Sequence, residues 1–256
     1  MHENDNKNNN LPIIFIHGSF ANSKSWRKIR ELLDASQKSI SVNLPGHGGL
    51  ADPPDFDDPE FETEFDAIRA QSNMLDQPVH LIGHSYGGVV ALAATLIGAF
   101  NVKKLTLFEP VAVGILNTFK RENSIKIVEK FVQDYFNASE LGEENVCARV
   151  IDFWGGSGAY DQIPPHVQAT MAPMAENNLR HWKLCKKSNF DAKLFQEIKI
   201  PVSIVHGTRS NSVAKDIAKT LHENIAESNL FSIEGASHFM ITSHAKESAN
   251  TIRNIS

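Results

Sequence analysis

The sequence lacks most of the features that assign a chain to a specialised class. Its 256 residues include only two cysteines, Cys147 and Cys185, too few for a disulfide framework, so we expect free thiols in a reducing compartment. No apolar run reaches the roughly 18 residues that span a bilayer. The first ten residues, MHENDNKNNN, contain no hydrophobic segment of a signal peptide. We therefore expect a cytoplasmic protein with no membrane partner and a disordered tail at residues 1–10.

Basic clusters and metal-binding motifs are missing as well. The formal net charge is −5, and Lys and Arg occur only in short pairs such as Lys103-Lys104 and Lys186-Lys187. Nucleic acids and anionic membranes require a basic patch. There is no His-Glu-x-x-His motif, and the two cysteines lack the spacing of metal ligands. We expect no nucleic-acid partner, no metal and no cofactor.

What the sequence does contain is an alternation of short apolar runs and amphipathic helices, typical of a parallel sheet covered on both faces. The predicted strands are Leu11–Ile16, Ser39–Leu44, Val79–Ile82, Lys104–Phe108, Ile200–Val205 and Leu230–Ile233. Between the fourth and fifth strands the pattern is helical only. We therefore predict an α/β fold with a mostly parallel sheet of about six strands, a core at residues 11–112 and 197–256, and a helical cap insertion at residues 113–196.

The third predicted strand ends in Gly83-His84-Ser85-Tyr86-Gly87 and leads into an apolar helix. Gly-x-Ser-x-Gly between a strand and a helix is the nucleophile-elbow pattern, in which small neighbours let the chain turn sharply and expose the serine hydroxyl. Ser85 is therefore the predicted nucleophile. The backbone N–H of Tyr86 is one predicted oxyanion donor, and Ser19 in the loop after the first strand is the other, with Phe20 as the alternative.

A serine nucleophile requires a base, and His238 is the best placed of the eleven histidines because it follows the last strand in a short loop. His47 and His206 also lie near strand ends and are weaker candidates. His84 is expected to point away from the site and to form structural contacts. The histidines on predicted helices, expected at the surface or behind the site, are His166, His181 and His244.

The segments HGSFANSKSW, NLPGHG, GHSYGG, LFEP, IVHG and GASHF, in this order, make nearly the whole chain after the tail resemble the α/β-hydrolase family. The resemblance implies a Ser-His-acid triad, a helical cap and hydrolysis of an acyl or related bond. Serine at the elbow separates the chain from the dehalogenase and epoxide-hydrolase branches, which have aspartate there. The family's two additional initial strands have no counterpart in this sequence.

The acid of the triad departs from the family pattern. The usual Gly-x-x-Asp after the fifth strand reads Gly207-Thr208-Arg209-Ser210 here. Glu109, at the end of the fourth strand, is the predicted acid. An acid elsewhere or a dyad without one remain alternatives, and Asp216 is expected to face solvent from the following helix.

The cap is rich in aromatic residues, most of which we expect to form its own core. Phe153 and Trp154, with Phe20, are the predicted substrate-binding residues. Because the cap has no cationic cluster, we expect a small-to-medium apolar ester or thioester as a small-molecule substrate.

The leading prediction is a serine hydrolase that cleaves carboxylic esters through an acyl-enzyme intermediate. A carbon–carbon bond hydrolase, a thioesterase and a perhydrolase would use the same triad. A ligand-binding protein on a hydrolase scaffold is disfavoured because Ser85 and His238 are both present.

Overall fold

The computed structural model describes residues 11–254, so the tail predicted at residues 1–10 lies outside the described residues. The described chain contains one six-stranded sheet with strand order β2-β1-β3-β4-β5-β6. All neighbouring strands are parallel, which confirms the predicted fold class. The strands are β1 (Ile13–Ile16), β2 (Ser39–Val42), β3 (Val79–His84), β4 (Val102–Phe108), β5 (Val202–Gly207) and β6 (Ser228–Ile233).

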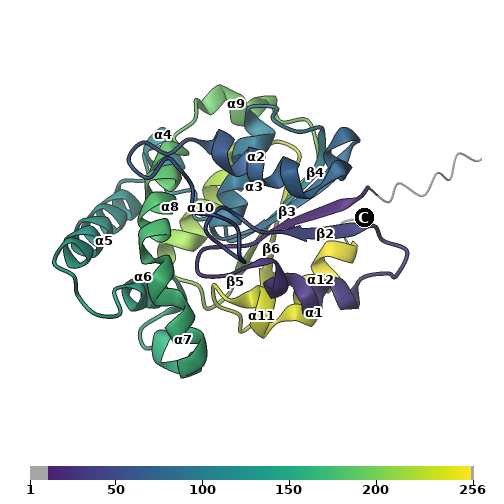
Figure 1. Cartoon of the computed structure of the whole chain (residues 1–256). Coiled ribbons are helices and arrows are strands. Elements are labelled where there is room, and N and C mark those ends of the chain that lie inside the picture. Colours follow the sequence, from purple (N-terminus) through teal and green to yellow (C-terminus); the bar gives the residue numbers. More distant parts are fainter. Residues whose placement is uncertain (1–10, 255–256) are drawn as a thin grey trace, which may run out of the picture.

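Helices cover both faces of the sheet, as Figure 1 shows. In β1, Ile13 and Phe15 belong to one hydrophobic cluster and Ile14 and Ile16 to the other, because successive side chains of a strand point to opposite faces. The first cluster is covered by η1 (Ser23–Trp26), α1 (Arg27–Leu32), α11 (Met240–Ser243) and α12 (Ala245–Asn254). The second is covered by α2 (Phe61–Gln71), α3 (Tyr86–Leu96) and α10 (Ser212–Asn224), with η2 (Asn73–Asp76) between α2 and β3.

The segment between β4 and β5 is helical in the structure. Its elements are α4 (Gly114–Thr118), α5 (Glu122–Glu140), α6 (Cys147–Gly155), η3 (Tyr160–Gln162), α7 (Pro165–Met171), η4 (Ala172–Met174), α8 (Ala175–Lys187) and α9 (Ala192–Glu197). Helices α5 to α8 lie together beside the sheet in Figure 1, and α4, α5 and α9 contact α10. The division of the chain into a core and a cap at residues 113 and 196 stays a prediction.

The topology places the loops after β1 and β3 next to each other. The chain leaves β1 for β2 on one side and returns to β3 on the other, so the crossovers diverge between β1 and β3. Ligands bind at the carboxyl ends of parallel strands at such a point. Ile16 pairs with Gly83, which brings the His17-Gly18-Ser19 segment beside Ser85.

Within residues 11–254, none of the helices combines the length and apolar character needed to cross a membrane.

Candidate active site

Ser85 lies in a strained turn between β3 and α3. Its backbone has φ 56° and ψ −124°, a conformation that a residue with a side chain rarely adopts. A Cβ on Gly83 would lie 2.3 Å from the carbonyl oxygen of Gly87, and a Cβ on Gly87 would lie 2.4 Å from the carbonyl oxygen of Ile16. Only glycine fits at either position, so both glycines of the motif are required by the close approach of the turn to the sheet.

The structure brings the three predicted triad residues together. Ser85 Oγ lies 3.0 Å from His238 Nε2, and His238 Nδ1 lies 2.8 Å from Glu109 Oε2. Their exposed fractions are 8%, 3% and 1%, respectively. They come from the ends of β3 and β4 and from the loop after β6, three segments that meet at the carboxyl edge of the sheet. This is the arrangement by which an imidazole can take a proton from a serine hydroxyl.

The other oxygen of the Glu109 carboxylate, Oε1, is also hydrogen-bonded. Oε1 accepts hydrogen bonds from the Gly207 N–H at 2.8 Å and from the Ser210 hydroxyl. Burial alone would raise the pKa of Glu109, but the hydrogen bonds and charge of His238 and the donors of Ser210 and Gly207 outweigh it and lower that pKa below its usual value. Glu109 is therefore ionised at neutral pH and can hold a protonated imidazole.

Ser210 occupies the position where the family pattern has aspartate. Its hydroxyl donates to Glu109, so the residue that replaces the usual acid supports the carboxylate that comes from the neighbouring strand. Asp216 in α10, which was expected to face solvent, is partly buried: its side chain is 27% exposed and accepts a hydrogen bond from Ser124 at 2.7 Å.

His84 supports the loop that carries His238. The His84 Nε2–H donates to the carbonyl oxygen of His238 at 2.7 Å, and the centroids of the two rings are 5.0 Å apart. Burial, together with the nearby His238, lowers the pKa of His84 to about 3, so its ring is neutral. His84 thus forms the structural contact expected for it, but it also lines the cavity above Ser85 and does not point away from the site.

The loop after β1 packs directly against the nucleophile. A Cβ on Gly18 would lie 2.8 Å from Ser85 Cβ, and Ser19 and Phe20 both line the cavity above Ser85. Phe20 has φ 56°, a left-handed conformation in a residue other than glycine. Tyr86 is the first residue of α3, where backbone N–H groups lack helical partners. The assignment of Ser19 and Tyr86 as oxyanion donors stays a prediction.

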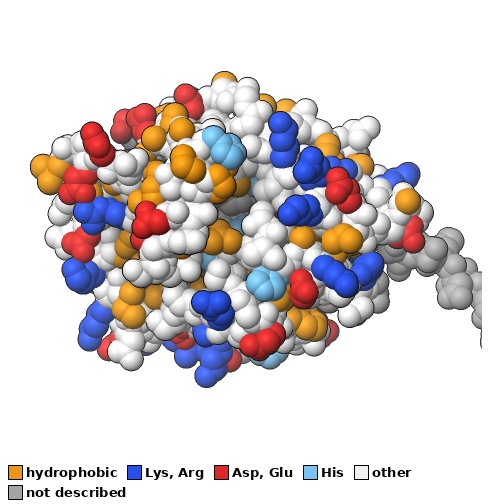
Figure 2. Space-filling view, turned by 90° about the horizontal axis from the view of Figure 1, so that it is seen from below, with side chains coloured by type: hydrophobic (Ala, Val, Ile, Leu, Met, Phe, Trp, Pro, Cys, Tyr) orange, Lys and Arg blue, Asp and Glu red, His pale blue; other side chains and the backbone are white. Residues whose placement is uncertain are grey.

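The cavity above Ser85 has a volume of about 420 Å³, within the range of small-molecule sites. None of its lining residues is Asp, Glu, Lys or Arg. Apolar side chains from the segment between β4 and β5 form much of its wall: Val150, Ile151, Trp154, Ile163, Val167, Met171 and Trp182. Figure 2 shows hydrophobic side chains bordering a hollow on this side of the molecule.

Of the two aromatic residues predicted for this wall, only one reaches it. Trp154 lines the cavity, and its ring stacks on His238 with centroids 5.5 Å apart. Phe153 is not among the lining residues; its ring stacks on Phe131 at 4.1 Å. Neighbouring residues of a helix point about 100° apart, so Phe153 faces the packing between helices when Trp154 faces the cavity.

The site also contains His181 of α8, which was expected at the surface or behind the site. It is 1% exposed, lines the cavity, and its Nδ1 lies 2.8 Å from Ser19 Oγ. Its ring stacks on Tyr86 with a centroid distance of 3.7 Å. The sequence carries no signal for this contact, because Ser19 and His181 are 162 residues apart and His181 has the spacing of any helical residue.

Residues 13–251 match the alpha/beta hydrolase family, and the chain belongs to this family of enzymes. It is 26% identical to a pimeloyl-[acyl-carrier protein] methyl ester esterase of Neisseria meningitidis over 94% of this chain and 91% of that protein. It is 24% identical to a 2-hydroxy-6-oxononadienedioate/2-hydroxy-6-oxononatrienedioate hydrolase of Pseudomonas putida over 96% of this chain and 87% of that protein. An esterase of Exiguobacterium antarcticum has the same fold, with a TM-score of 0.69, 20% identity, and coverage of 95% of this chain and 91% of that one.

Proposed function

We propose that this chain is a serine hydrolase that cleaves small-to-medium, neutral, apolar carboxylic esters through an acyl-enzyme intermediate. The observation that carries the proposal is the hydrogen-bonded chain Ser85–His238–Glu109, which ends at an uncharged cavity. A buried histidine with a serine hydroxyl on one nitrogen and an ionised carboxylate on the other is suited to activate that hydroxyl.

In the proposed reaction, Ser85 Oγ attacks the ester carbonyl carbon while His238 Nε2 takes the hydroxyl proton. Glu109 holds the Nδ1–H and stabilises the imidazolium. The backbone N–H groups of Tyr86 and Ser19 donate to the developing oxyanion. His238 then passes its proton to the departing alcohol, which leaves Ser85 acylated. Water attacks the acyl carbon, with His238 again as base, and the carboxylic acid and free serine are formed.

The lining of the cavity supports a neutral substrate. A carboxylate that entered it would lose its hydration without meeting a Lys or Arg side chain, which is costly. Apolar walls favour an acyl or alcohol group with little polarity. The name of the Neisseria relative, a methyl ester esterase, is consistent with ester chemistry at this kind of site.

A carbon–carbon bond hydrolase is the second candidate, because the Pseudomonas relative is named for such a substrate. That name describes a dioate, a molecule with two carboxylates. The absence of any Lys or Arg from the lining of this cavity favours the ester over that dianion. Thioesters and peracids would pass through the same acyl-enzyme.

Two measurements test the proposal. A fluorophosphonate probe should label the wild-type protein and fail to label Ser85→Ala; absence of labelling in the wild type would reject the enzyme in favour of a ligand-binding protein. A substrate panel should then include p-nitrophenyl esters with a neutral acyl chain and with an acyl chain of equal length that ends in a carboxylate, together with a thioester and a dicarbonyl compound. We expect the neutral ester to have a kcat/KM at least about tenfold above the charged one. Preference for the charged ester or for the dicarbonyl compound would reject the proposed substrate class.

A further inference from the structure

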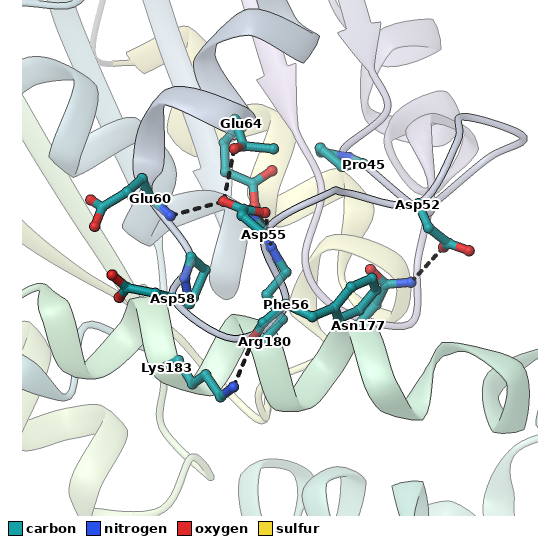
Figure 3. Close-up of polar contacts among 12 residues, drawn as sticks. Pro45, Asp52, Asp55, Phe56, Asp58, Glu60, Glu64, Asn177, Arg180 and Lys183 are labelled. Carbon is teal, nitrogen blue, oxygen red and sulfur yellow. Dashed lines mark hydrogen bonds and ion pairs between the residues drawn. The ribbon is translucent and has the colours of Figure 1, made fainter.

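Helix α8 is fastened to the loop that precedes α2 by one face of the helix. Asn177 Nδ2 donates to Asp52 at 3.0 Å, Arg180 donates to both oxygens of Asp55 at 2.8 and 3.0 Å, and Lys183 Nζ donates to the carbonyl oxygen of Phe56 at 2.7 Å. Figure 3 shows these contacts. Residues three apart on a helix lie on the same face. The rotation and height of α8 above the sheet are therefore set by several independent contacts.

The same helix reaches the residue that follows the nucleophile. Arg180 Nη1 donates to Glu64 Oε1, which also accepts a hydrogen bond from the Tyr86 hydroxyl at 2.5 Å. The side chains of Arg180 and Glu64 are both 0% exposed. The far end of the Tyr86 side chain is thus tied to α8 through a buried carboxylate.

His181, the next residue of α8, contacts both predicted oxyanion residues. Its ring is nearly parallel to that of Tyr86, with an interplanar angle of 12° at 3.7 Å, and it also stacks on His47 at 5.1 Å. Its Nδ1 forms the hydrogen bond with Ser19 Oγ. Burial, together with the nearby His47, lowers the pKa of His181 well below the usual value, so the ring is neutral.

We infer that His181 is a positioning residue that holds Ser19 and Tyr86 where their backbone N–H groups can bind the oxyanion. This inference rests on the proposed function. Oxyanion donors act only when they are fixed within a few tenths of an ångström of the developing charge. The loop after β1 contains Phe20 in a left-handed conformation that its own sequence does not favour, so an external contact is needed to hold it. The hydrogen bond from α8 to Ser19 supplies that contact.

A pair of substitutions separates the effect of the His181 hydrogen bond to Ser19 from the effect of its ring stacking on Tyr86. His181→Phe keeps a ring against Tyr86 and loses the bond to Ser19, whereas the amide of His181→Asn can reach the place of Nδ1. We expect His181→Phe to lower kcat by about tenfold to a hundredfold with KM changed less than about threefold, since complete loss of a donor costs about 10²–10³. His181→Asn should recover most of kcat. Lys183→Met is the matched control, because Lys183 attaches the same helix through the carbonyl oxygens of Phe56 and Asp57 and not through Ser19 or Tyr86; it should keep wild-type kcat.

A trifluoromethyl ketone, which forms an oxyanion on Ser85, gives a second readout. Its affinity should fall in parallel with kcat in His181→Phe, while the affinity for the alcohol product, which has no oxygen at the oxyanion position, stays unchanged. Ser19→Ala should reproduce the loss, and the double variant Ser19→Ala/His181→Phe should be no worse than either single variant, because both remove the same hydrogen bond.

Wild-type kcat and ketone affinity in His181→Phe, or losses that add in the double variant, would overturn the inference. If His181→Phe does not fold, Ser19→Ala decides alone, and wild-type turnover in it overturns the inference. A wild-type protein that fluorophosphonate does not label would instead reject the proposed function, so the two failures are distinct.

Discussion

Replacement of Glu109 by glutamine tests the proposed acid, and the structure dictates how the new amide must lie. Glu109 Oε1 faces two donors, the Gly207 N–H at 2.8 Å and the Ser210 hydroxyl, whereas Oε2 faces His238 Nδ1 at 2.8 Å. A backbone N–H cannot become an acceptor. The glutamine oxygen must therefore take the place of Oε1, and its NH₂ group must face His238.

This orientation inverts the tautomer of the histidine. An NH₂ group can only donate, so Nδ1 becomes the acceptor and the ring proton moves to Nε2, where it points at Ser85 Oγ. The ring then has no lone pair with which to take the serine proton. The comparable change in a well-studied serine protease triad costs about 10⁴ in kcat, which corresponds to about 5.4 kcal/mol of transition-state stabilisation. KM should change little, because Glu109 does not line the cavity.

The assay is steady-state hydrolysis of a neutral p-nitrophenyl ester, with Ser85→Ala as the background and thermal unfolding as the check on folding. Glu109→Asp keeps the carboxylate at a longer distance and should fall between wild type and Glu109→Gln. A folded Glu109→Gln protein that retains turnover within a few-fold of wild type would refute the reasoning about both the acid and the tautomer.

The remaining predictions concern the attachment of α8 and the cavity wall. Arg180→Met leaves Glu64 buried without its ion-pair partner, so the free energy of unfolding in urea should fall by about 3–5 kcal/mol and recover in part in the double variant with Glu64→Gln; an unchanged midpoint contradicts this. Burial alone would raise the pKa of Asp55, but hydrogen bonds from Arg180 and its neighbours hold that pKa at about 2. Because this folded pKa is below the unfolded value of about 3.9, the resulting stabilisation is present above about pH 4 and is lost as the pH falls toward 2. The free energy of unfolding should therefore fall less between pH 6 and pH 2 in Asp55→Asn than in the wild type. An equal fall in both proteins would reject the ion pair. Trp154→Ala removes the ring that stacks on His238 and lines the cavity, so KM for a neutral ester should rise several-fold and Trp154→Phe should restore it; equal KM values in all three proteins would exclude a role in binding.

The triad geometry could be predicted because it depends on the ends of strands. Ser85 and Glu109 follow two apolar runs, and His238 follows the last one; the carboxyl ends of parallel strands meet at one edge whatever the details of packing. The sequence also has serine in place of aspartate at position 210, which makes Glu109 the predicted acid. That Ser210 donates to Glu109 was not visible, because a serine in a turn has many possible partners.

The contacts made by helices could not be predicted in the same way. The rotation of α8 is set by ion pairs with a loop more than 100 residues earlier, so the direction in which His181 points has no local signal. Trp154 and Phe153 are adjacent and both aromatic, and only the packing of α6 decides which of them faces the cavity. The apolar runs of the sequence predict where the strands end, whereas the direction in which these helix side chains point depends on tertiary contacts.

The origin of the acid on β4 has a consequence for how the enzyme loses activity. Ser85 N–H donates to the carbonyl oxygen of Phe108 at 3.0 Å, and Glu109 N–H donates to the carbonyl oxygen of Val205 at 2.9 Å. The first bond continues the pairing of β3 with β4 and the second that of β4 with β5, so the backbone of both triad residues is held by the sheet. His238 alone sits on a separate loop. On moderate heating we therefore expect the loop that carries His238 to detach before the sheet unfolds. Activity should be lost at that stage and should return on cooling.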